Sequence, residues 1–162
     1  HESPVRGETF VTRKIVMGLC KIYLGLQKKI YLGNLKAKRD WGHARDYVEG
    51  MWKILQQKKP DDYVLATGKQ YSVKEFASLA LKELGIKFSW KGSGVKEKCI
   101  DHSGKVLIEC DPTYYRPLEV ATLLGDASKA RKKLNWKPKT NLPSLVKEMI
   151  AEELKSLNAK KK

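Results

Sequence analysis

The chain opens with residues 1–15, which read His-Glu-Ser-Pro-Val-Arg-Gly-Glu-Thr-Phe-Val-Thr-Arg-Lys-Ile. Serine, proline and glycine in the first seven positions favour a turn. Apolar side chains then recur at Val11, Ile15, Leu19 and Ile22, at the three- and four-residue intervals of one helix face. Because glycine commonly ends helices, residue 25 marks the end of this one. The spacing predicts a helix over residues 9–24.

Beyond this helix, apolar runs alternate with turn residues, and each run has the period of a strand or a helix. Ser72-Val73-Lys74-Glu75 fits a capping box, in which serine and glutamate satisfy the first free amides of a helix. Gly85 is placed to end that helix. Helices are predicted over 42–59, 73–84 and 128–134 and in a last segment that carries residues 145–157; strands are predicted over 29–32, 62–67, 86–90 and 106–110.

These elements indicate a mixed α/β fold, and 162 residues without an internal repeat favour one compact unit. Residues 91–105, rich in glycine and lysine, are expected to form a flexible loop, and residues 158–162 a basic tail. The sequence contains neither a G-x-G-x-x-G nor a P-loop pattern. A complete dinucleotide-binding Rossmann half is therefore not expected here.

The charge is strongly positive, since 33 Lys and Arg against 18 Asp and Glu give a formal net charge of +15. Such a balance points to an anionic partner, and a nucleic-acid-binding module is one alternative. The lysines argue against it, because they are spread from Lys14 to Lys162 and are not interleaved with aromatics in one segment. Much of the charge is expected to be solvated surface.

Three cysteines without a C-x-x-C pair argue against a disulfide framework and a structural zinc site. They fit a reducing, cytoplasmic compartment. No apolar run approaches the roughly 18 residues of a membrane span, and no membrane partner is expected. The start at His1, in a sequence typical of a loop, suggests a fragment.

Two arginines lie on predicted turns beside aromatic residues. Arg39 lies in Lys-Arg-Asp-Trp-Gly-His (residues 38–43) and Arg116 in Tyr-Tyr-Arg-Pro-Leu-Glu (residues 114–119). A planar guanidinium there can bind a phosphate bidentately. The alternative is a surface ion pair with the adjacent carboxylates, Asp40 or Glu119, of little energetic consequence.

These segments resemble the GDP-mannose 4,6-dehydratase family, a branch of the extended short-chain dehydrogenase/reductase family. Residues 10–15 with residues 39–44 carry the specific part of the resemblance, whereas Arg39-Asp40 and Arg116-Pro117 alone would indicate only the wider family. Further matching segments are 1–9, 32–35, 66–68, 71–73, 116–120, 123–126 and 134–138. The sequence departs from the family pattern at Val5, where an arginine is usual, and at Lys36, where an acidic residue is common.

The resemblance implies the C-terminal, substrate-binding part of an extended short-chain dehydrogenase fold, without its N-terminal dinucleotide-binding half. The family is a lyase that uses NADP to convert GDP-mannose to GDP-4-keto-6-deoxymannose, on the route to GDP-fucose and other deoxysugars. Its glycine-rich loop and its catalytic Thr, Glu, Tyr and Lys match nothing in this chain. The resemblance therefore implies a fragment that is inactive alone, with the missing half and further copies as partners. Another nucleotide-sugar dehydratase or epimerase of the wider family is the alternative.

The same resemblance implies site residues. His1 and Arg6 correspond to positions that contact NADP, whereas no catalytic residue is carried over. The positions implied for GDP binding are Val11 and Lys14 at the first helix, Gly33 near the nucleotide, Arg39 and Arg116 on the pyrophosphate, and Glu119 on the ribose. The beginning of a helix also suits an anion on physical grounds, because its first amides lack helical partners.

Several other polar or reactive residues are expected to be structural. His43 precedes a predicted helix and is expected to cap or pack, and His102 is expected to be solvated. The cysteines are expected to be buried or inert thiols, because no neighbouring histidine or cationic pocket is apparent in the sequence. Trp52, with Val48 and Leu55 on one helix face, is expected to lie in the core.

Overall fold

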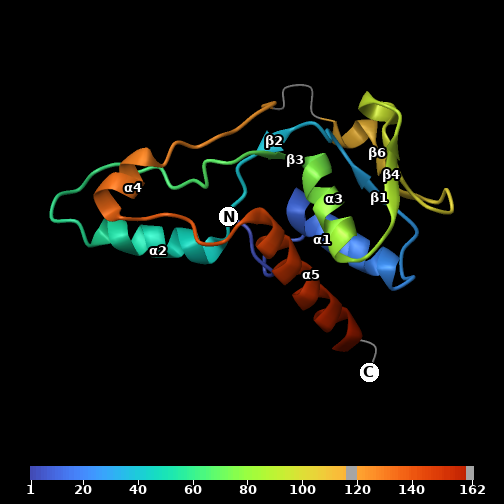
Figure 1. Ribbon diagram of the computed structural model, residues 1–162, viewed down its shortest axis with the longest axis horizontal. Coiled ribbons are helices and arrows are strands. Elements are labelled where there is room, and N and C mark those ends of the chain that lie inside the picture. Colours follow the sequence, from blue (N-terminus) through green and yellow to red (C-terminus); the bar gives the residue numbers. More distant parts are fainter. Residues whose placement is uncertain (116–119, 160–162) are drawn as a thin grey trace.

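The computed structural model describes residues 1–115 and 120–159. Figure 1 shows an elongated molecule, with most of the secondary structure gathered at one end. The helices are α1 (Val11–Tyr23), α2 (Ala44–Leu55), α3 (Val73–Glu83), α4 (Ser128–Leu134) and α5 (Leu142–Ala159), with short 3-10 turns at Gly94–Lys96 and Pro112–Tyr114. The strands are β1 (Ile30–Leu32), β2 (Lys38–Arg39), β3 (Tyr71–Ser72), β4 (Phe88–Lys91), β5 (Lys98–Asp101) and β6 (Val106–Cys110).

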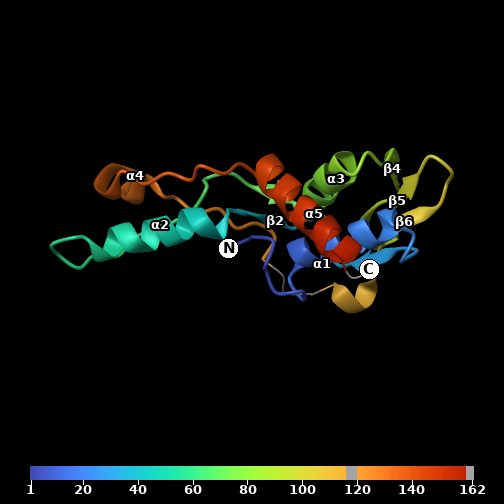
Figure 2. The ribbon, with the colours of Figure 1, turned by 90° about the horizontal axis from the view of Figure 1, so that it is seen from below.

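The larger part of the molecule packs three helices beside a four-stranded sheet of order β1-β6-β5-β4. β1 is parallel to β6, and the other pairs are antiparallel. α1, α3 and α5 contact one another, and α1 also contacts β1 (Figure 2). The main hydrophobic core lies among these elements and includes the fully buried Ile15, Phe76 and Met149. A buried ion pair, Arg13 to Glu153 at 2.6 Å, joins α1 to α5.

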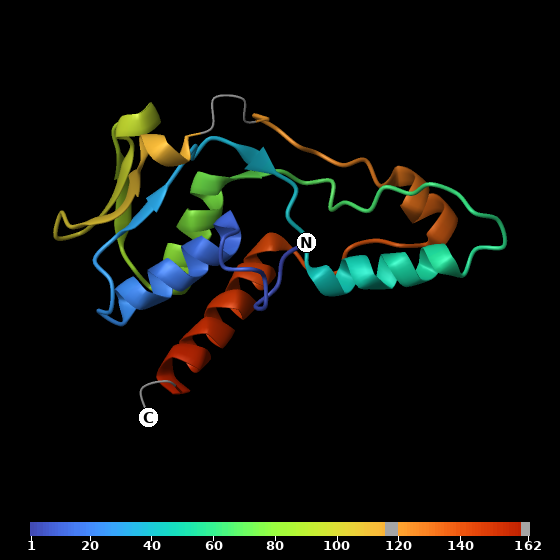
Figure 3. The same cartoon turned by 180° about the vertical axis from the view of Figure 1, so that it is seen from behind.

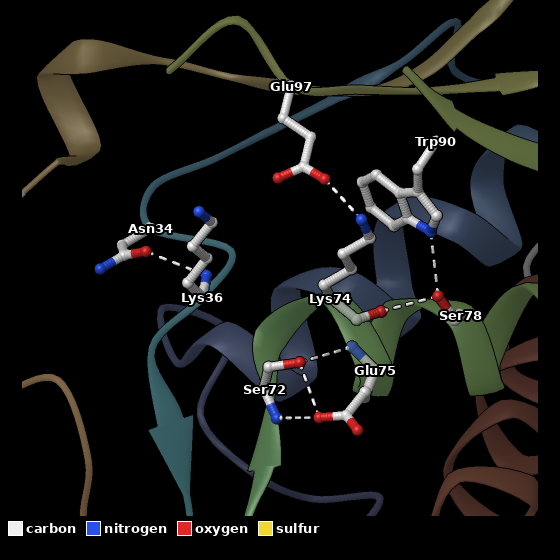
Figure 4. Close-up of polar contacts among 8 residues, drawn as sticks. All are labelled: Asn34, Lys36, Ser72, Lys74, Glu75, Ser78, Trp90 and Glu97. Atoms are coloured by element: carbon white, nitrogen blue, oxygen red, sulfur yellow. Dashed lines mark hydrogen bonds and ion pairs between the residues drawn. The ribbon is translucent and has the colours of Figure 1, made fainter. Parts of the chain in front are cut away.

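Polar contacts fix α3 against the sheet (Figure 4). The predicted capping box is confirmed: the amide of Glu75 donates to Ser72 Oγ at 3.1 Å, and the amide of Ser72 donates to Glu75 Oε2 at 2.6 Å. Lys74 reaches from α3 to Glu97 at 2.5 Å. Trp90 on β4 donates to the hydroxyl of Ser78 at 3.0 Å. Gly85 follows the helix with φ +67°, as expected for the residue after a helix end.

The smaller part contains α2, α4 and the two extended segments that lead to and from them (Figure 3). Its own hydrophobic cluster is centred on Trp136, whose indole donates to the carbonyl of Asp46 at 2.7 Å. The carboxylate of Asp46 accepts from the amides of Lys139 and Thr140. The described chain thus has two separate hydrophobic clusters, and its organisation as one compact unit stays a prediction.

Three expectations about individual segments are wrong. Residues 91–105 are not a loop: they contain β5, whose Cys99 is fully buried, and the glycines at 92, 94 and 104 form the turns. Residues 62–67 form no strand, because among the described residues no strand pairs with them, and Val64 is 54% exposed. Residues 158 and 159 belong to α5, whereas residues 160–162 lie outside the described residues.

The apolar face of α2 also differs from expectation. Trp52 is 60% exposed and Leu55 81% exposed, and Val48 and Met51 on the same face are also exposed. These side chains follow the i, i+3, i+4, i+7 spacing of a face that normally packs on a neighbour. Within the described chain, Trp52 is therefore not a core residue. None of the helices in residues 1–115 and 120–159 is long and apolar enough to cross a membrane.

Candidate functional site

A pocket of about 600 Å³ lies where the beginning of α1, the segment after β1, and β2 approach the turn that follows β6. We call it the α1 pocket. It is lined by Thr9, Phe10, Val11, Lys14, Leu32, Gly33, Asn34, Ala37, Arg39, Val73, Thr113 and Tyr114. All four of the predicted nucleotide-binding residues that the structure describes, Val11, Lys14, Gly33 and Arg39, lie in this lining, although they come from three separate segments.

The two cations of the α1 pocket are held in different ways. Lys14 Nζ lies 3.7 Å from the centre of the Tyr114 ring, a cation–π contact. Burial lowers the pKa of Lys14, and the nearby Asp111 carboxylate partly opposes that shift. Arg39 donates from Nη1 to the carbonyls of Lys38 and Val120, both at 2.8 Å, and these bonds fix its guanidinium on β2. The pocket therefore presents two positioned cations to an anionic ligand.

The first turn of α1 forms another part of the wall. α1 begins at Val11, and Phe10 before it offers no side-chain cap. Because the first amides of a helix lack partners within the helix, they are donors available to a ligand or solvent. The positive end of the helix dipole also favours an anion here.

Gly33 is required by the backbone around the pocket. A Cβ at this position would overlap the carbonyl of Tyr114. Glycine thus allows the segment after β1 to lie directly against the turn at residues 112–114. This packing role explains why glycine is needed at position 33 even when no ligand is bound. Contact between Gly33 and the nucleotide stays a prediction.

A second pocket, of about 630 Å³, adjoins the first and shares Phe10, Val11 and Arg39 with it. We call it the amino-terminal pocket. Both predicted cofactor residues, His1 and Arg6, line it. Its remaining lining residues are Glu2, Asp40, Trp41, Tyr47, Val64, Leu65, Ala66, Leu123, Leu124 and Gly125.

His1 and Arg6 are each positioned by an aromatic ring. The ring of His1 stacks on Tyr47 at 3.8 Å between centroids, and the guanidinium of Arg6 lies 3.4 Å above the Phe10 ring. Arg6 Nε is 3.6 Å from the buried carboxylate of Glu2. That nitrogen is buried and has no hydrogen-bond partner in the part of the chain that the structure describes. Burial raises the pKa of Tyr47 to about 12, so its hydroxyl stays protonated at neutral pH.

Two predicted site residues, Arg116 and Glu119, lie outside the described residues. Sequence reasoning also missed two members of the site. Tyr114 and Phe10 each hold a site cation, yet neither received a role. For Tyr114, the sequence does contain a signal: the aromatic pair at 114–115 stands directly before Arg116.

The structural interpretations of the histidines and cysteines are confirmed. His43 is buried and caps α2: Nδ1 accepts from the amide of Arg45 at 3.0 Å, and Nε2 lies 3.0 Å from Glu148. His102 is exposed. All three cysteines are buried and unpaired. Burial raises the pKa of Cys20 and of Cys99 to about 12, and therefore neither is a thiolate at neutral pH.

Comparison with known proteins decides the family. The sequence model of the family described as GDP-mannose 4,6 dehydratase matches residues 1–149. The chain belongs to the GDP-mannose 4,6-dehydratase family. It is 57% identical over 159 residues to GDP-mannose 4,6 dehydratase 2 of Caenorhabditis elegans, and 51% identical over 166 residues to GDP-mannose 4,6-dehydratase of Vibrio cholerae. These alignments cover 98% and 96% of this chain but only 42% and 45% of the relatives.

Solved structures show the same fold at lower identity. RMD from Pseudomonas aeruginosa complexed with NADPH aligns with a TM-score of 0.77 and 15% identity, over 95% of this chain and 46% of that one. The dTDP-glucose 4,6-dehydratase of Bacillus anthracis in complex with NAD aligns with a TM-score of 0.71 and 16% identity, over 97% and 43%. The expected fold class, part of an extended short-chain dehydrogenase fold, is confirmed for this member of the dehydratase family.

Proposed function

We propose that this chain is the substrate-binding part of a GDP-mannose 4,6-dehydratase and that the α1 pocket binds the GDP portion of GDP-mannose. One observation carries the proposal: Val11, Lys14, Gly33 and Arg39 are separated by up to 28 positions in sequence, yet line one pocket. The resemblance assigned those four positions to one nucleotide. In the proposal, Lys14 and Arg39 neutralise the pyrophosphate beside the first amides of α1.

In this proposal the complete enzyme is an NADP-dependent lyase that forms GDP-4-keto-6-deoxymannose. The nicotinamide would supply the acceptor and donor of hydride. The amino-terminal pocket has features that fit part of such a cofactor: the buried Arg6 Nε without a hydrogen-bond partner among the described residues, and the stacked ring of His1 at the rim. Arg6 would bind an anionic or carbonyl oxygen, and His1 would orient the ring near the nicotinamide end.

The same proposal assigns catalysis to residues outside this chain. The chain spans less than half the length of the curated relatives that it matches. We propose that the exposed apolar face of α2 receives the dinucleotide-binding part of the family fold, because Trp52 and Leu55 would then be buried as their spacing requires. This chain alone would bind the nucleotide without converting it.

The proposal also includes a cytoplasmic setting and an oligomeric enzyme. Three buried, unpaired cysteines fit the cytoplasmic setting.

A thermal-shift titration with GDP tests the proposed nucleotide site. A ligand that binds only the folded state raises the melting temperature, and the rise grows with the logarithm of the ligand concentration once that concentration exceeds Kd. We expect GDP to stabilise the chain more than UDP does, since the alternative UDP-sugar enzymes would reverse that order. A folded sample whose melting temperature does not change at about 10 mM GDP would rule out the proposed site.

Two lysines of the same helix provide a matched pair of variants. Lys14→Ala removes a cation from the pocket lining, whereas Lys21→Ala removes one from the last turn of α1, outside the pocket. Loss of one charge-assisted contact is expected to weaken GDP binding about tenfold in Lys14→Ala. Lys21→Ala is expected to bind GDP like the parent chain. Equal weakening in both variants would mean that general charge, and not the α1 pocket, attracts the nucleotide.

A further inference from the structure

A third pocket, of about 290 Å³, has no lining residue in common with the α1 pocket. Its lining comes from the segment that enters β3 and from the connection between α4 and α5. We call it the basic pocket because four of its lining side chains are cations: Lys69, Arg131, Lys137 and Lys139. They come from three different parts of the chain, so folding brings them together.

The cations of the basic pocket are only partly neutralised. Lys139 Nζ pairs with Glu49 at 2.6 Å, and Arg131 Nη2 is 3.8 Å from Asp126. In residues 1–115 and 120–159, neither Lys69 nor Lys137 forms an ion pair with a carboxylate. The lining itself therefore contains four cations and no carboxylate, and the carboxylates of Glu49 and Asp126 beside it neutralise part of that charge.

Arg131 reaches across the pocket from α4. Its Nη1 lies 3.9 Å from the position that a Cβ on Gly68 would occupy, next to Lys69. The guanidinium therefore lies close to the chain segment that carries Lys69, and both residues line the pocket. A guanidinium with an ammonium group nearby is a common arrangement for holding a phosphate.

Two carboxylates near the pocket are already satisfied by backbone amides. Asp46 accepts from the amides of Lys139 and Thr140, and Asp40 accepts from the amides of Thr67 and Gly68. Those amides are not available to a ligand, so an anion in the pocket must be bound by the side chains of the cations. α5, which begins at Leu142 in the lining and is 18 residues long, adds the positive end of its dipole.

The rest of the lining favours an organic ligand over a bare ion. Trp41, Tyr71, Pro138 and Leu142 supply apolar or aromatic surface, and the volume approaches the lower limit of small-molecule sites. We propose that the basic pocket binds a small phosphate ester, with its phosphate on Arg131, Lys69 and Lys137 and its sugar or ring against Tyr71. This site is separate from the proposed GDP site.

Amide chemical shifts locate such binding directly. Phenyl phosphate, which joins a ring to a phosphate, is titrated into the isotope-labelled chain, with inorganic phosphate as a comparison. We expect saturable shifts at the amides of residues 67–71 and 139–142, and tighter binding of the ester than of the inorganic ion. Shifts confined to the α1 pocket, or no saturation, would overturn the proposal.

A pair of double variants separates a built site from general charge attraction. Arg131→Gln with Lys137→Gln removes two cations of the lining, and Lys132→Gln with Lys133→Gln removes two exposed cations of α4 that lie outside it. The first variant is expected to bind phenyl phosphate at least about tenfold more weakly, and the second like the parent. Equal loss in both would contradict the proposal and favour nonspecific binding of polyanions such as nucleic acid.

The outcome is independent of the proposed GDP site. GDP is expected to shift amides of residues 11–14 in the parent and in both double variants. Because all four substituted side chains are exposed, unfolding is not expected, and an unchanged circular dichroism spectrum verifies it. Loss of GDP shifts with retained shifts at the basic pocket would count against the proposed function alone.

Discussion

At the scale of single residues, most of the polar groups that the sequence singles out have a structural partner as well as a possible ligand. Arg6 contacts Phe10 and Glu2, Lys14 contacts Tyr114, and Arg39 donates to two carbonyls. Such contacts hold a cation in one orientation before a ligand arrives, which reduces the entropy lost on binding. The fold itself therefore fixes the orientation of these three cations.

His43 provides a residue-scale prediction about stability. His43→Ala removes the cap on the amide of Arg45 and the contact with Glu148, and we expect it to lower the free energy of unfolding by about 1–2 kcal/mol. His43→Asn keeps a side-chain acceptor at the cap position, so its cost should be smaller. Urea denaturation measures both. Equal costs for the two variants would show that capping is not the role of His43.

At the scale of elements, helices were predictable because their signals are local. The capping box at Ser72–Glu75 and the apolar spacing of α1 depend only on neighbouring residues, and both are confirmed. The strand predicted at 62–67 failed because a strand needs a partner that sequence does not reveal. The sequence does not predict β5, because the glycines on either side of it favour a loop by composition, whereas in the structure they form turns.

Contact between α1 and β1 gives an element-scale prediction. A methyl group at Gly18 would overlap Cγ2 of Ile30, whereas alanine normally favours a helix more than glycine does. We expect Gly18→Ala to lose about 1–3 kcal/mol of stability because overpacking exceeds the gain in helix propensity. Urea denaturation of the Gly18→Ala variant measures this loss of stability.

The branch of Ile30 supplies the control. Ile30→Leu moves the branching methyl away from the backbone. The double variant that combines Gly18→Ala with Ile30→Leu should therefore recover part of the stability that Gly18→Ala alone loses. Strict additivity of the two substitutions, or a Gly18→Ala chain more stable than the parent, would contradict the packing described for α1 and β1.

The sheet supplies a prediction about pH. Glu109 on β6 lies 2.6 Å from Lys29 Nζ and 2.8 Å from Lys98 Nζ, and these contacts lower its pKa from 4.5 to about 2. A carboxyl with a lowered folded-state pKa stabilises the fold above its unfolded pKa, and that contribution is lost as the pH falls towards the folded value. Glu109 therefore stabilises the sheet at neutral pH and progressively less between about pH 4.5 and 2.

Glu109→Gln removes this dependence. The stability difference between parent and variant should be largest near neutral pH and should shrink as the pH falls to about 3. Urea midpoints at several pH values measure it, and Glu152→Gln, an exposed residue of α5, is the control. A difference that is constant with pH would contradict the role given to the two lysines.

At the scale of the whole molecule, the two hydrophobic clusters and the exposed face of α2 could not be predicted from the sequence. Apolar spacing correctly predicted that α2 has one apolar side, but it cannot say whether a neighbour covers that side. In the candidate site, the four described positions that are predicted to bind the nucleotide come from a family resemblance. Their convergence in one pocket depends on long-range packing, which no local pattern encodes.

The exposed face predicts self-association of the chain on its own. Trp52 and Leu55 are among the most exposed apolar residues, and such faces cause association in water. We expect concentration-dependent oligomers by size exclusion with light scattering, and fewer of them for Trp52→Gln with Leu55→Gln. Tyr23→Gln with Leu26→Gln, at the far end of α1, is the control of similar exposure. A chain that remains monomeric at every concentration would argue against α2 as a docking face.

A crystal structure of this chain with GDP would show whether the α1 pocket is the GDP site that we propose. We predict that the pyrophosphate lies at the beginning of α1, within hydrogen-bond distance of Lys14 and Arg39, with Gly33 beside the nucleotide. GDP bound at the basic pocket or elsewhere, with the α1 pocket unoccupied at saturating ligand, would contradict the claim.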